Sequence, residues 1–217
     1  PDAAFDRMEQ WLDGWTGELA EPEETAPAQR GVHPIEQETA QVHIGLAWDA
    51  VPESHPDAMR ERLAIAILSG GTSGRLFSEV RQKRSLCYSV GASYAAGRDR
   101  GLVTLYAGTT PERAQETLDV SMAEVRRLAE GFSDEEFRRA VIGLKSRLVM
   151  QGESTPARAA ALASDQHRIG RPRSLDERLA EVEAVTPDDL RRYVADRSPG
   201  PFTLATIGPR PLAIPEG

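Results

Sequence analysis

Hydrophobic positions recur at two spacings along the chain, and each spacing predicts a different kind of element. Apolar residues three or four positions apart predict helices over residues 2–15 and 56–69. Alternating apolar and polar residues predict strands over residues 39–48, 87–94, 102–108 and 202–207. A short charged turn with a glycine at each end separates the second and third strands, which indicates an antiparallel hairpin.

Helix start signals are frequent in the second half of the chain. Ser133-x-x-Glu136 and Ser174-x-x-Glu177 are capping-box patterns, whose side chains satisfy free backbone N–H groups at a helix start. Threonine followed by proline marks further starts at 110–111, 155–156 and 186–187. The combined order predicts an α+β domain, an antiparallel-containing mixed sheet with helices packed on one face and the other face free.

Residues 70–94 carry the features that bear most on function. Gly70 and Gly71 end an apolar helical stretch and predict a structural loop, because glycine permits backbone angles and close approaches that a Cβ obstructs. A short helix follows, whose polar side carries Arg75 and, near its end, Arg81, and then comes a strand with Tyr88 near its start. Neither G-x-x-x-x-G-K-[ST] nor G-x-G-x-x-G is present, which disfavours a nucleotide-binding loop.

The sequence allows two interpretations of the orientation of the Tyr88 side chain. Strand alternation places Tyr88 with Val90 and Tyr94 on the more apolar face, as expected for a core tyrosine. A β-bulge near Cys87 would instead turn Tyr88 to the opposite face. Arg81 likewise has the plain interpretation of a solvated surface arginine, because charged side chains usually lie in water.

Composition limits the class of protein and its partners. The chain has 217 residues and 40% hydrophobic content, enough for one core of ordinary domain size, so we expect a soluble globular domain. The net charge of −8 and the pI near 5.1 disfavour nucleic acid and anionic membrane as partners, because both are polyanions. No apolar run approaches the roughly 18 residues of a membrane span. The single cysteine, Cys87, is expected to be a small buried hydrophobe.

The histidines predict no metal site in this chain. There are four, His33, His43, His55 and His167, and no two lie at the spacing at which one helix supplies two zinc ligands. His43 falls on the more polar face of its strand, but no second ligand stands at a suitable spacing. We therefore expect neither a metal nor a catalytic residue in this chain.

Residues 70–94 resemble the glycine-rich helix and strand in the second halves of the pitrilysin, insulysin and mitochondrial processing peptidase superfamily. In that family an arginine and, seven residues later, a tyrosine contact the substrate at a zinc active site, and the matching positions are Arg81 and Tyr88. The resemblance runs from about residue 30 to 207. Residues 85–87 read Ser-Leu-Cys where the family usually has Gly-Leu-Ala. The family's zinc motif, H-x-x-E-H, is absent.

The resemblance implies the non-metal half of a zinc metallopeptidase, inactive alone, which closes a proteolytic chamber around a peptide substrate. Zinc is then expected on a homologous partner half, in the same parent chain or a separate subunit; a second copy of this chain is the other partner considered. Residues 1–30 would end the preceding half and form a linker, 31–210 would be the peptidase-like domain, and 211–217 a tail. The alternative is a structural or assembly module of the same fold, as in core subunits of respiratory complexes.

Overall fold

The computed structural model describes residues 2–18, 30–197 and 199–215. Within these ranges, six long or medium helices follow the first helix, together with five strands and three short helical turns. In chain order these elements are α1 (Asp2–Leu12), β1 (Gly31–Glu36), β2 (Val42–Ala50), α2 (Ala58–Ser69), η1 (Gly71–Ser73), η2 (Phe77–Gln82), β3 (Cys87–Ala96), β4 (Gly101–Thr109), η3 (Pro111–Arg113), α3 (Ala114–Ala129), α4 (Asp134–Gly152), α5 (Thr155–Ile169), α6 (Leu175–Glu183), α7 (Pro187–Asp196) and β5 (Thr203–Gly208).

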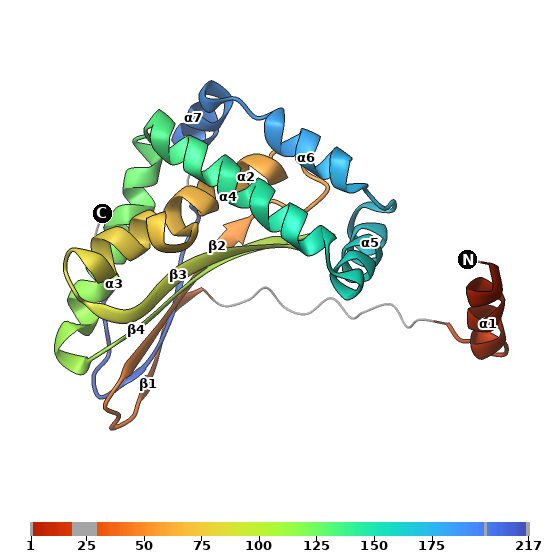
Figure 1. The fold of residues 1–217 in the computed structure, drawn as a ribbon. Helices are drawn as coiled ribbons and strands as arrows, with labels where there is room; N and C mark the ends of the chain where they lie inside the picture. Colours follow the sequence, from red (N-terminus) through yellow and green to blue (C-terminus); the bar gives the residue numbers. More distant parts are fainter. Residues whose placement is uncertain (1, 19–29, 198, 216–217) are drawn as a thin grey trace.

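The five strands form one mixed sheet in the order β1-β5-β2-β4-β3. β1 and β5 run parallel, and every other neighbouring pair is antiparallel. Helices α2 to α7 all lie on one side of this sheet (Figure 1). The predicted α+β class and the one-sided packing of the helices are thus confirmed. We call the face turned away from α2–α7 the outer face of the sheet.

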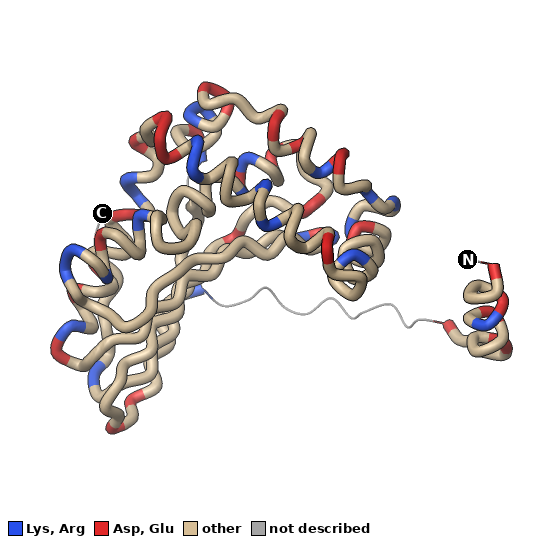
Figure 2. Tube along the Cα trace, viewed as in Figure 1, with Lys and Arg blue, Asp and Glu red and all other residues tan. Residues whose placement is uncertain are grey.

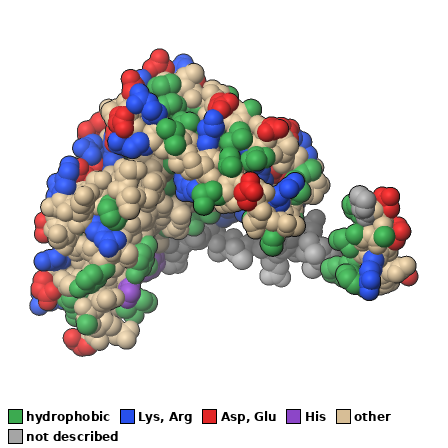
Figure 3. Space-filling model, viewed as in Figure 1, with side chains coloured by type: hydrophobic (Ala, Val, Ile, Leu, Met, Phe, Trp, Pro, Cys, Tyr) green, Lys and Arg blue, Asp and Glu red, His purple; other side chains and the backbone are tan. Residues whose placement is uncertain are grey.

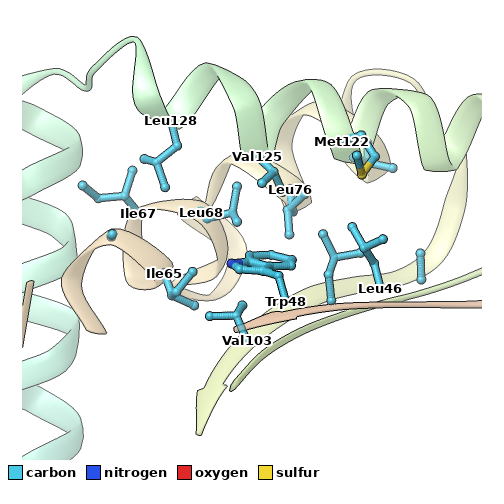
Figure 4. Close-up of a cluster of buried hydrophobic side chains, with 14 of the residues drawn as sticks. Leu46, Trp48, Ile65, Ile67, Leu68, Leu76, Val103, Met122, Val125 and Leu128 are labelled. Carbon is cyan, nitrogen blue, oxygen red and sulfur yellow. The ribbon is translucent and has the colours of Figure 1, made fainter. Parts of the chain in front are cut away.

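Burial of β2 shows how the alternating sequence selects the two faces. Four alternate residues are buried beneath the helices, namely Val42, Ile44, Leu46 and Trp48. The residues between them, His43 among them, are only partly buried on the outer face. Trp48 lies at the centre of the core, close to side chains from α2, α3 and β4 (Figure 4). Its ring also meets the edge of Phe202, with 5.5 Å between ring centroids.

Helix α2 is buried around most of its circumference because it lies between the sheet and other helices. It packs against β3 on one side and against α4 and α7 on others. Consecutive residues 63–68 are all buried as a result. This central position explains the continuous apolar run in its second half, whereas α3 buries only a stripe that includes Leu118, Met122 and Val125.

Strand β1 is absent from the predicted order of elements. It lies at an edge of the sheet, and among the described strands it pairs only with β5, near the other end of the chain. Its residues are mostly exposed, and Pro34 lacks the N–H that an internal strand needs. An edge strand tolerates both features because a neighbour pairs with only one side of it. The local pattern therefore held no strand signal.

The helix starts follow the capping signals closely. Both predicted capping boxes are present, one at Ser133 with Glu136 and one at Ser174 with Glu177. A third box forms at the start of α7. At α5 the cap is Ser154, whose hydroxyl accepts a hydrogen bond from the Ala157 N–H, so the cap lies one residue before the predicted threonine.

The first helix is shorter than predicted. α1 ends at Leu12 rather than near residue 15, and Gly14 follows with a φ of 78°. None of its residues is buried, and its large apolar side chains, Phe5 and Trp11 among them, are exposed. Most of the predicted linker, residues 19–29, lies outside the described part of the chain.

Charged residues gather on the helices and loops, while the strands carry few (Figure 2). Over the helices, charged and hydrophobic side chains alternate at the surface (Figure 3). Beneath them lies a group that we call the buried ion network, formed by Glu53, Arg62, Asp165, Arg173 and Arg178. Its ion pairs, 2.7 to 2.8 Å long, join the loop after β2 to α2, α5 and α6.

Arg173 is the centre of the buried ion network. Its Nη2 lies 2.7 Å from Glu53 and 2.8 Å from Asp165, and its side chain is 10% exposed. Burial acts to raise the pKa of both carboxyl groups, but the nearby guanidinium groups outweigh it and lower both pKa values. These contacts hold α5, whose only buried residue is Asp165, against the rest of the domain.

Candidate functional site

The candidate site begins at the sharp turn that follows α2. A Cβ on Gly70 would lie 2.3 Å from the Ala66 carbonyl oxygen, closer than any side chain permits. Gly71 has a φ of 86°, a conformation that glycine adopts readily and other residues seldom do. These two residues turn the chain from α2 into η1, and the segment that follows packs against β3 and α3.

Arg75 fixes the start of that segment to α4. Its Nε and Nη2 donate to the two carboxylate oxygens of Glu136 at 2.6 and 3.1 Å, and Nη2 also donates to the Gly131 carbonyl at 2.8 Å. Only 8% of Arg75 is exposed, so it is not part of the polar helix side on which the sequence pattern placed it. Burial acts against ionisation of Glu136, but the bonds from Arg75 and Ser133 lower its pKa to about 2.

Arg81 lies on a π-helical turn, a geometry that occurs often at functional sites. The Lys83 N–H donates to the Ser78 carbonyl at 2.9 Å, five residues back, and Val80 points into the core. Arg81 is exposed, and its guanidinium carbon lies 5.2 Å from the centre of the Phe77 ring. Among the described residues no carboxylate lies within ion-pair distance of it.

Tyr88 occupies a β-bulge at the start of β3. Cys87 pairs with Thr109 and Ser89 pairs with Gly108, so Tyr88 is an extra residue between two consecutive pairs. Cys87 is buried, whereas 61% of Tyr88 is exposed. The core interpretation of Tyr88 is therefore wrong. The bulge breaks the strict alternation that put Tyr88 with Val90, which is why the simple pattern pointed to the apolar face.

Arg81 and Tyr88 line one pocket of about 290 Å³, which we call the Arg81–Tyr88 pocket. The other residues that line it are Ser85, Leu86, Cys87, Thr110 and Arg113. Burial raises the pKa of the Cys87 thiol, and the positive charge of Arg81 acts in the opposite direction. Arg113 was missed in the sequence, where the threonine and proline before it indicated only a helix start.

Backbone contacts hold the segment between Arg81 and Tyr88 in place. The Ser85 N–H donates to the Arg81 carbonyl at 3.0 Å, and the Leu86 N–H donates to the Val80 carbonyl at 3.0 Å. Arg113 donates to the Ser85 carbonyl. Ser85 has a φ of 52°, which is uncommon for a residue other than glycine and persists where surrounding contacts enforce it. These contacts therefore hold the residues that line the pocket in place, so the pocket is preorganised.

The outer face carries a second polar pair, formed by His43 and Tyr106. His43 Nδ1 lies 2.8 Å from the Tyr106 hydroxyl, and the two rings stack with 6.0 Å between centroids. Within the described ranges, no three His, Cys, Asp or Glu residues are grouped so that they could hold a metal ion. His43 thus has a tyrosine as its partner.

Within the described residues, no helix is long and apolar enough to cross a membrane.

The family described as "Peptidase M16 inactive domain" matches residues 1–144, about two thirds of the chain. The chain belongs to this family. A Streptomyces coelicolor protein named "uncharacterized zinc protease" is 35% identical over 187 residues, which are 85% of this chain and 40% of the relative. The M16 inactive domain thus spans well under half of that relative's length.

Solved structures share the fold. A peptidase M16 inactive domain from Pseudomonas fluorescens aligns with a TM-score of 0.74 and 23% identity, over 88% of this chain and 47% of the other. A chain of complex III from Candida albicans aligns with a TM-score of 0.73 and 19% identity, over 89% of this chain and 49% of the other. At these identities the likeness concerns the fold alone.

Proposed function

We propose that this M16 inactive domain is the non-metal half of a zinc-dependent peptidase and presents Arg81 and Tyr88 to a peptide held on a zinc-bearing partner half. The observation that carries the proposal is the shared pocket, which brings the two residues together through a bulge and a π-helical turn. Both side chains are exposed, and Arg81 has no carboxylate partner among the described residues. They are free to meet a ligand.

The chemistry of the pair suits peptide hydrolysis. Attack on a peptide bond develops negative charge on its carbonyl oxygen, and a guanidinium and a phenol are donors for that oxygen or for a neighbouring carbonyl. The chain has no H-x-x-E-H motif, so the water-activating metal would come from the partner half. Relatives named zinc protease are more than twice as long as the matched region, which leaves room for such a half.

Reassembly with a zinc-bearing half tests this division of labour. The chain alone should contain no stoichiometric zinc and should leave an unstructured peptide uncut. With a half that carries H-x-x-E-H, from the same parent protein or a separate subunit, chelator-sensitive cleavage should appear. Cleavage by this chain alone would refute the proposal. A stable complex with such a half that never cleaves a peptide would instead support the structural-module alternative.

Variants of the reassembled enzyme test the two residues. Loss of one preorganised donor to an oxyanion costs about 10²–10³ in rate, so Tyr88→Phe should lower kcat by about that factor. Arg81→Ala should act similarly, or raise KM if its contact is equally strong in the ground state. Arg84→Ala is the matched control, because Arg84 is paired with Glu79 at 2.8 Å. Full activity in Tyr88→Phe would remove Tyr88 from the site.

A further inference from the structure

The Arg81–Tyr88 pocket is positively charged in an acidic chain. Two guanidinium groups, from Arg81 and Arg113, line the pocket, and the lining contains no acidic residue. The chain as a whole carries a net charge of −8. Glu112 adjoins Arg113 in sequence but is not among the lining residues, and no ion pair between the two is present in the described structure. The local charge is thus opposite in sign to the overall charge.

Arg113 has donors to spare. One of its Nη atoms donates to the Ser85 carbonyl, the only hydrogen bond of this side chain within the described residues. An arginine has five N–H donors in a planar fork, so several of the Arg113 donors remain available to a ligand in the pocket that this residue lines. The bond to Ser85 holds one end of the fork, which lowers the entropy lost when the other donors bind a ligand. Arg113 is therefore a positioned cation rather than a freely moving surface group.

We propose that Arg113, together with Arg81, forms a carboxylate-binding subsite that makes this half prefer peptides with a carboxylate beside the segment held by Tyr88. Planar guanidinium groups match carboxylates in shape and form charge-assisted hydrogen bonds with them. The volume of about 290 Å³ suits a single side chain or chain end. The carboxylate comes from an Asp or Glu side chain or from the C-terminus of the peptide. This subsite rests on the proposed peptide-binding function.

Titration of the whole 217-residue chain with four matched peptides tests the subsite. The peptides carry either Glu or Gln at one position and end in either a free carboxylate or an amide. NMR titration of the ¹⁵N-labelled chain reads dissociation constants into the millimolar range, and the arginine Nε–H signals report contact at the pocket. We expect at least one carboxylate-bearing peptide to bind about tenfold more tightly than the neutral peptide.

The four peptides also identify the source of the carboxylate. A preference that follows Glu assigns the pocket to an acidic side chain, and one that follows the free terminus assigns it to a chain end. Either result supports the subsite. Equal binding of all four peptides overturns it and leaves the proposed function standing, because the neutral peptide still binds. Absence of binding by every peptide also overturns the subsite, whereas the proposed division of labour is decided separately by reassembly with the zinc-bearing half.

Three variants separate the subsite from general electrostatics. Arg113→Gln should remove the carboxylate preference while the neutral peptide still binds, and Arg113→Lys should keep part of it, because the charge remains without the fork. Arg98→Gln removes the same charge at the exposed turn between β3 and β4, at the opposite end of the sheet strands. An equal loss of preference in Arg98→Gln would contradict the proposal. If Arg113→Gln fails to fold, the four peptide titrations of the wild-type chain decide whether the subsite exists.

Discussion

Arginines in this domain occur in two settings that differ in whether a carboxylate lies beside them. In the buried ion network, Arg173 contacts both Glu53 and Asp165 and is nearly buried. In the Arg81–Tyr88 pocket, Arg81 and Arg113 line a solvent-accessible cavity whose lining holds no acidic residue. A buried charge is costly unless it is paired, whereas an exposed charge is not. Burial together with pairing therefore marks the arginines that hold the fold together.

The same contrast appears within one short segment. Arg75 and Arg81 are six residues apart, and the sequence pattern put both on the polar side of one helix. Arg75 is buried and makes a two-bond contact with Glu136, while Arg81 is exposed beside Tyr88. Arg75 anchors the segment to α4. Arg81 is therefore held in position, while its guanidinium group stays free to bind a ligand. The difference predicts opposite consequences for stability and for activity.

The largest effect is expected from Arg173→Met. Removing one partner of a buried ion pair leaves the other charge uncompensated and costs about 3–5 kcal/mol. Arg171→Met is the matched control, because Arg171 pairs with Glu177 at the exposed surface, where a pair contributes about 0–1 kcal/mol. Urea unfolding curves of both variants provide the measurement. If Arg173→Met costs less than 1 kcal/mol, the network is not what holds α5 in place.

An intermediate and pH-dependent effect is expected from Glu136→Gln. The change removes the charged acceptor of Arg75 and should cost about 1.5–3 kcal/mol at neutral pH. The folded pKa of about 2 lies below the unfolded value, so the contribution of Glu136 is present above about pH 4.5 and lost as the pH falls towards 2. The stability gap between wild type and variant should close across that range.

Glu135→Gln provides the control for this pH series. Glu135 precedes Glu136 in the same first turn of α4, but its partners Arg138 and Arg139 are on the exposed surface. Its effect on unfolding should be small at every pH. If the difference in unfolding free energy between wild type and Glu136→Gln does not narrow in acid, the stabilising contact of Arg75 does not depend on the charge of Glu136.

The smallest effect on stability is expected from Arg81→Ala and Tyr88→Phe. Both side chains are exposed, and the contact of Arg81 with the Phe77 ring contributes about 0.5–1 kcal/mol at an exposed site. Thermal melts should therefore lie close to wild type, even where peptide turnover falls. A loss of more than 2 kcal/mol in either variant would place that residue with Arg75 and Arg173, and the contrast between the two settings would fail.

Local sequence features were enough to predict most of the helices and strands. Alternation located β2, β3, β4 and β5, and capping residues such as Ser133 and Ser174 marked helix starts, because their hydrogen-bond partners lie within three residues. These signals succeed because each depends on neighbours in the chain. Arg81 and Tyr88 were singled out by the resemblance of residues 70–94 to a peptidase family, and their contact with a substrate stays a prediction.

Tertiary structure alone decided four further features. β1 pairs only with β5, near the other end of the chain, so its own residues carry no alternating pattern. Arg75 became buried because α4 brings Glu136 to it, and Arg113 joined the pocket because α3 begins beside the start of β3. Tyr88 turned outward because Thr109 and Gly108 on β4 pair with residues on either side of it. Each outcome depends on contacts between distant segments, which no local pattern of residues encodes.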